Sequence, residues 1–154
     1  MKTLKYLLIG LSVIFAIIGF LAFALIELYQ YETTHAPKDF YKERLEFISE
    51  EPLPSCKILR SDYISNSFVA AIIQLNETDY AKVLKATQAT KGLIIAPKVS
   101  FWGSANELIK EEKIDINKVI VMYEGHHGTY YFSYLKHIGF LPPNIIIYEE
   151  NLNN

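Results

Sequence analysis

The stretch EGHHGTYYFSYLKHIGF, residues 124–140, decides the fold because it can be a helix or a strand. It lies between two short apolar runs, residues 119–123 and 145–148, that have the composition of buried strands. A helix over 129–138 would make 118–149 a strand–loop–helix–strand unit, long enough for a right-handed parallel crossover. A strand would instead form a hairpin with its turn at Gly125 to Gly128.

Residues 129–138 fit the helical period better, although their aromatic content favours a strand. The apolar side chains recur at positions i, i+3, i+4 and i+7: Tyr131, Tyr134, Leu135 and Ile138. Thr129 can cap the first turn, and Gly139 can end the last one. We therefore expect a helix here, with residues 125–128 as the loop that precedes it.

The remainder of the domain alternates between helical and strand patterns. Helices are expected over 38–50, 76–90 and 104–113, and strands over 56–60, 68–75, 93–96, 119–123 and 145–148. Asn76 or Thr78 can cap the second helix, and Ser104 with Glu107 fits a capping box for the third. Asn76 also begins a glycosylation sequon, but capping is the simpler explanation. The fold class is α+β, a mixed sheet of about five strands with three to four helices.

The N-terminus carries the strongest signal of location. Residues 6–26 contain no charge and would span ~31 Å as a helix, close to the thickness of a bilayer core. Cleavage after Ala24 as a secretory signal is the alternative, but the apolar run is longer than such signals need. Lys2 and Lys5 precede the span and no basic residue follows until Lys38, which favours a cytoplasmic N-terminus.

This assignment divides the chain into four parts. They are a cytoplasmic n-region (1–5), a transmembrane signal anchor (6–28), a linker (29–37) and an extracytoplasmic domain (38–154). Lys42 and Arg44 lie close enough to the span to weaken the orientation.

Composition excludes some classes of function. The formal net charge is −2 and no basic tract occurs, so nucleic acid is not expected as a partner. Cys56 is the only cysteine, so no internal disulfide can form, and a buried unreactive thiol is the simplest interpretation. No recognisable motif for a cofactor or a metal ion is present, and we expect neither.

Two groups of residues are candidates for function. Glu124, His126 and His127 could serve a small hydrolase or a metal-dependent enzyme, since imidazole can transfer protons and bind metals. Adjacent histidines rarely converge on one atom, however, and exposed loop histidines between two glycines that permit the turn are the preferred interpretation. The second group consists of aromatic residues suited to a protein interface: Phe101, Trp102, Tyr130 and Tyr131.

The absence of a catalytic motif favours a binding function. The leading hypothesis is a membrane-anchored extracytoplasmic module that engages a protein partner, of the inhibitor, immunity or envelope-accessory type, without catalysis of its own. The enzyme is the alternative. A third hypothesis is an accessory subunit whose span makes the contact, since Gly19, Ala16 and Ala22 could pack closely against another helix.

Overall fold

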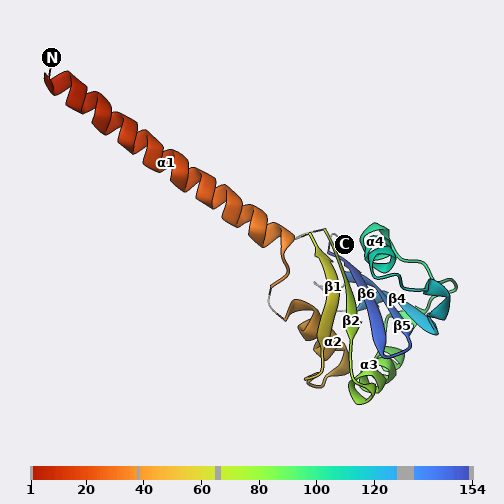
Figure 1. Ribbon diagram of the computed structural model, residues 1–154. Helices are drawn as coiled ribbons and strands as arrows, with labels where there is room; N and C mark the ends of the chain where they lie inside the picture. The colour runs from red at the N-terminus through yellow and green to blue at the C-terminus, as the bar shows by residue number, and fades with distance from the viewer. Residues whose placement is uncertain (1, 38, 65–66, 128–133, 153–154) are drawn as a thin grey trace.

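The computed structural model describes residues 2–37, 39–64, 67–127 and 134–152. It consists of one long N-terminal helix followed by a small α+β domain built on a single six-stranded sheet (Figure 1). The helices are α1 (Lys2–Thr34), α2 (Phe40–Ser49), α3 (Glu77–Ala89) and α4 (Gly103–Glu111), with a short 3₁₀ helix η1 (Ile116–Lys118). The strands are β1 (Lys57–Tyr63), β2 (Phe68–Gln74), β3 (Leu93–Ile95), β4 (Val121–His127), β5 (Tyr134–Leu141) and β6 (Ile145–Asn151).

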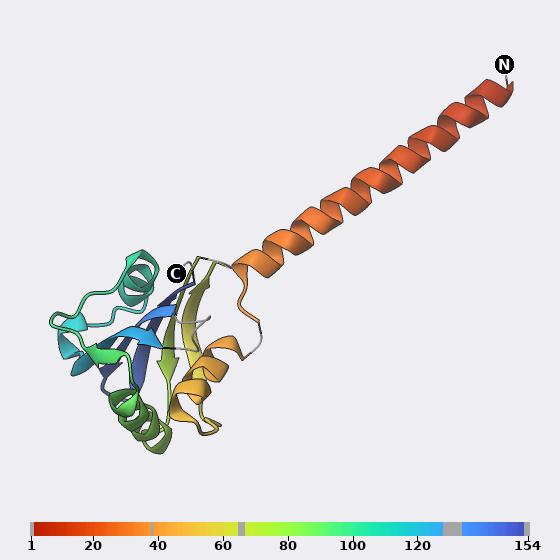
Figure 2. The ribbon, with the colours of Figure 1, turned by 180° about the vertical axis from the view of Figure 1, so that it is seen from behind.

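Helix α1 projects away from the domain, as both views of the ribbon show (Figures 1 and 2). Its segment Gly10–Tyr31 is long and apolar enough to cross a membrane by length and composition, and the domain buries none of it. The predicted N-terminal apolar helix is therefore confirmed. Its C-terminal end lies beside the end of the sheet where β1 finishes and β2 begins.

The sheet has the strand order β1-β2-β6-β5-β4-β3, and every neighbouring pair is antiparallel. The predicted α+β class is therefore confirmed, although the sheet is antiparallel instead of mixed and has one strand more than the five predicted. The additional strand is β5, which occupies residues predicted to be helical. The predicted β1–β2 hairpin is confirmed, as are the helices at α2 and α3.

The prediction of a helix over 129–138 is wrong for the residues that the structure describes. Residues 134–138 belong to β5, which lies between β4 and β6, so both of its edges are hydrogen-bonded to neighbouring strands. The spacing of Tyr134, Leu135 and Ile138 therefore does not report a helix. With β5 as a strand, β4, β5 and β6 run back and forth, and no parallel crossover joins the apolar runs.

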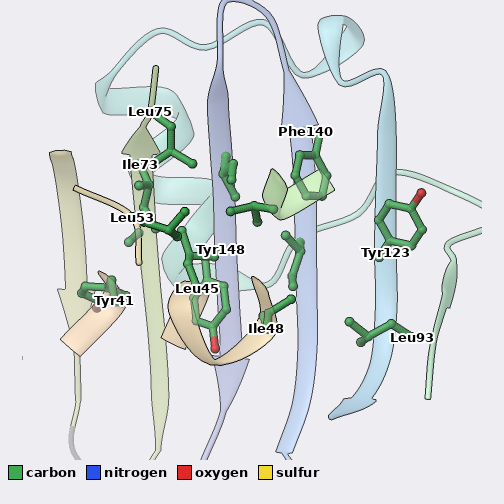
Figure 3. Close-up of a cluster of buried hydrophobic side chains, with 14 of the residues drawn as sticks. Tyr41, Leu45, Ile48, Leu53, Ile73, Leu75, Leu93, Tyr123, Phe140 and Tyr148 are labelled. Carbon is green, nitrogen blue, oxygen red and sulfur yellow. The ribbon is translucent and has the colours of Figure 1, made fainter. Parts of the chain in front are cut away.

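Helices α2 and α3 cover one face of the sheet, and α4 covers the opposite face (Figure 2). Leu45 and Ile48 of α2 belong to the same buried cluster as Tyr148 and Phe140 of the sheet (Figure 3). Side chains alternate along each strand, so the neighbours Ile146 and Ile147 contribute to opposite faces. Burial on both faces explains why the central strands are almost wholly apolar.

The starts of the helices fit the sequence in one case and differ in another. The side chain of Asn76 accepts a hydrogen bond from the backbone N–H of Asp79 at 2.7 Å, as expected of an N-cap. The capping box predicted for Ser104 and Glu107 is wrong, because α4 already begins at Gly103 with Trp102 as its N-cap. A residue far along the chain binds this helix start instead.

Candidate binding site around Trp102

Three titratable side chains lie side by side across the α4 face of the sheet. His137 of β5 pairs in register with Glu149 of β6 on one side and with Glu124 of β4 on the other. Its Nδ1 atom lies 3.3 Å from Glu149 Oε2, and its Nε2 atom lies 4.0 Å from Glu124 Oε2. The imidazole thus lies between two carboxylates. We call Glu124, His137 and Glu149 together the row.

The two carboxylates differ in their exposure to water. Glu149 is fully buried and His137 is almost so, whereas 34% of the Glu124 side chain is exposed. A buried carboxylate needs hydrogen-bond donors, and Glu149 finds them in His137 and in the backbone of the segment before α4. Glu124 is the member of the row that a solute can reach.

Trp102 is held directly above this row. Its backbone N–H donates to both oxygens of Glu149, at 2.8 and 3.1 Å. Its ring lies 4.1 Å from the His137 ring, measured between centroids, and meets Phe68 edge-on at 5.6 Å. Because backbone and ring are both fixed, the partly exposed indole is ordered before any partner arrives.

Phe101 anchors the same segment. Its ring is buried over Gly139 of β5, where an added Cβ would lie only 2.6 Å from the ring carbon Cζ. Asn106 of α4 donates from Nδ2 to the Phe101 carbonyl at 2.6 Å, which ties the segment to the helix. Gly139 therefore leaves the space that lets Phe101 enter the core and places Trp102 above His137.

Replacing Gly139 with alanine should lower the free energy of unfolding by about 1–3 kcal/mol, because the new methyl group overpacks the site of the Phe101 ring. Trp102 is the only tryptophan, so its fluorescence should also change as the segment shifts. Urea unfolding of the full chain in mild detergent measures both effects. Gly103→Ala is the matched control, since no atom lies within 4 Å of its added Cβ. Equal stability of the two variants would contradict this packing argument.

The sheet beyond Glu124 is open on this face. Helix α4 packs mainly against β1, β2 and β6, and its cluster of buried side chains extends to Met122 of β4. Ile94 of β3 is the cross-strand partner of Glu124 and is 63% exposed. We define the Trp102 surface as the continuous strip across this face formed by Phe68, Trp102, His137, Glu124 and Ile94.

A second polar cluster lies on the opposite face of the sheet. Buried Glu150 accepts hydrogen bonds from Lys136 Nζ at 2.6 Å and from the Tyr148 hydroxyl at 2.8 Å, and Arg44 Nε lies 3.3 Å away. Burial lowers the pKa of Lys136, although the Glu150 carboxylate opposes the shift. Burial, reinforced by the same carboxylate, raises the pKa of Tyr148 well above its usual value. These groups satisfy one another inside the domain.

The predicted acid–base residues fall in a different setting from the one expected. Residues 125–127 belong to β4 rather than to a loop, so the predicted position between a strand and a helix is wrong. Gly125 has a φ of 139° and lies against the carbonyl of Gly92, the residue just before β3, which explains the glycine there. The side chains of His126 and His127 are outside the described residues, and the hydrolase hypothesis stays a prediction.

The aromatic residues predicted for a protein interface also differ in their exposure. Phe101 is 4% exposed and packs in the core, whereas Trp102 is partly exposed. Tyr130 and Tyr131 lie outside the described residues. Cys56 is half-buried, and burial raises the pKa of its thiol to about 11, so the group is neutral near pH 7.

Sequence reasoning missed His137 and Glu149 as parts of a site. His137 was expected near the end of a helix, and Glu149 follows an apolar run with no motif around it. Their pairing depends on the register of β5 against β6, which local patterns do not contain. The one available signal was the aromatic content of residues 129–138, which favours a strand.

The row has little of what metal binding or hydrolysis requires. The two carboxylates flank the imidazole instead of converging on one point, and the described residues contain no group of three potential ligands around a common centre. The row instead holds Trp102 in a fixed position at the surface.

A hollow of about 460 Å³ lies on the other face of the sheet, between the ends of α2 and α3, and is lined by Phe47, Ala86 and Thr90 among others.

Comparison of the chain with protein-family models, with curated proteins and with solved structures found no match. No function can be transferred from a relative on this basis. The geometry of the Trp102 surface and the properties of α1 therefore carry the functional argument.

Proposed function

We propose that this protein is a membrane-anchored binding module whose α+β domain engages a protein partner outside the cytoplasm. The observation that carries the proposal is the fixed, partly exposed Trp102, held through its backbone by Glu149 and through its ring by His137 and Phe68. Helix α1 supplies the anchor, and its flanking charges favour a cytoplasmic N-terminus.

An ordered tryptophan is well suited to protein recognition. Trp buries a large area on binding, and it is enriched among the few interface residues that dominate affinity. Here the ring is already immobilised, so little side-chain entropy remains to be lost when a partner covers it. Ile94 at the open edge of the sheet adds apolar area to the same surface.

The edge strand β3 offers a second mode of contact beside the tryptophan. It pairs only with β4, so its outer backbone groups face away from the sheet, and Ile94 and Ile95 are both more than 60% exposed. Exposed apolar edge strands accept an added strand from a partner. A partner that extends the sheet at β3 would lie next to Glu124, one strand further in.

Replacing Trp102 with alanine should remove the partner from the full chain used as bait in detergent-solubilised membranes of the source cell. Loss of a dominant interface residue costs about 2 kcal/mol or more, which corresponds to about a 30-fold weaker complex. Quantitative mass spectrometry of the captured proteins measures the loss. Circular dichroism must show that the variant remains folded.

Two further variants, used as bait in the same way, test whether capture depends on Trp102 specifically. Phe47→Ala removes a more exposed aromatic side chain from α2, on the opposite face, and should leave capture unchanged. His126→Ala/His127→Ala tests the alternative site. A partner that depends on Phe47 or on the histidines but not on Trp102 would reject the proposed surface.

A further inference from the structure

We propose that the partner presents a basic side chain, arginine above all, which stacks on Trp102 and forms an ion pair with Glu124. This inference rests on the proposed function and specifies the chemistry of its partner. It follows from the charge of the row, from the exposed indole beside it and from the position of Glu124 at the open side.

The row carries an unbalanced negative charge. Among the described residues, Glu124 and Glu149 each form an ion pair with His137 alone. Two carboxylates lie on either side of one imidazole, so acidic groups outnumber basic groups in the row.

On the opposite face of the sheet, the buried carboxylate of Glu150 is paired with cations of its own chain and needs no partner protein. Glu150 has two cations of its own chain, Lys136 and Arg44, within ion-pair distance. Within the part of the chain that the structure describes, Glu149 and Glu124 share His137 as their ion-pair partner. The cation that Glu124 lacks can therefore come from a bound protein.

The geometry suits a guanidinium. Trp102 lies against His137 at 4.1 Å, and His137 lies 4.0 Å from Glu124, so the indole and the exposed carboxylate are separated by one imidazole. Arginine combines stacking on an aromatic face with paired hydrogen bonds to a carboxylate, and tryptophan is the best aromatic acceptor of a cation. Its aliphatic stem can lie along apolar Ile94.

Selection from a phage-displayed library of random peptides on the full chain, held in nanodiscs, tests this inference. Peptides enriched on the wild type but not on Trp102→Ala should share an arginine or lysine at one position. Glu124→Lys reverses the charge at the row and should replace that preference with aspartate or glutamate. For one selected peptide, Glu124→Gln should weaken binding by about tenfold or more.

Glu43→Lys is the matched control, because it reverses the charge of an exposed glutamate on α2 and should leave the selected sequences unchanged. Trp102-dependent peptides that lack a basic residue, or a preference that survives Glu124→Lys, would overturn the inference and leave the proposed function standing. Recovery of no Trp102-dependent peptide would overturn the proposed surface as well.

Discussion

Glu150→Gln should lower the free energy of unfolding by about 3–5 kcal/mol. The change leaves Lys136 buried without its carboxylate, and breaking a buried ion pair from one side costs far more than the pair is worth. Arg44 is partly exposed and can turn toward water, but Lys136 is only 2% exposed and cannot. Urea unfolding of the full chain in mild detergent, followed through Trp102 fluorescence, measures the loss.

The dependence on pH identifies the cause. Burial already lowers the pKa of Lys136, and removal of Glu150 should lower it further. The unfolded chain then binds more protons than the folded one, so stability should rise as the pH rises from 7 toward 10. The double variant Lys136→Met/Glu150→Gln should recover most of the loss. A loss that neither rising pH nor the second change reduces would show that the charge of Lys136 is not responsible.

Gly125→Ala should be destabilising by about 3 kcal/mol or more, and it should act on β3 first. The φ of 139° is a conformation that alanine rarely adopts, and the new Cβ would overlap the carbonyl of Gly92, just before the paired strand β3. Backbone atoms cannot move aside as a flexible side chain can. We expect β3 to separate from β4 before the rest of the sheet opens.

Hydrogen exchange provides the local measurement. The amide of Ala96 donates to the Met122 carbonyl at 2.8 Å, just beyond β3, and its protection should fall in the variant. The amide of Ile120, which donates to Phe140 within the same sheet, serves as the internal control and should lose less. Equal loss at both amides would indicate global destabilisation and contradict a local effect at β3.

Local patterns predicted most elements, and the reasons are visible in particular residues. The run from Phe68 to Gln74 is apolar because β2 is covered on both faces, and Asn76 caps α3 as its side chain suggests. These features depend on neighbours in the sequence. The apolar helix α1 belongs to the same category.

The main wrong predictions concern β5, the direction of the strands in the sheet and the surroundings of His137. Lys136 and His137 interrupt its apolar alternation, and their burial is tolerated only because Glu150 and Glu149 stand opposite them on β6. That compensation comes from a strand that follows a turn, so the residues of β5 alone resemble an amphipathic helix. Once β5 was taken for a helix, the antiparallel order and the row at His137 could not be foreseen.

The short connection between α1 and α2 restricts where binding takes place. Residues 35–39 can extend over roughly 17 Å at most, so the domain stays close to the end of α1. If α1 spans a membrane as proposed, the domain diffuses only within a thin layer next to the lipid and not through the whole solution. If the partner is itself held at the same membrane, confinement to this layer raises the effective concentration of both proteins and strengthens a contact that is weak in free solution.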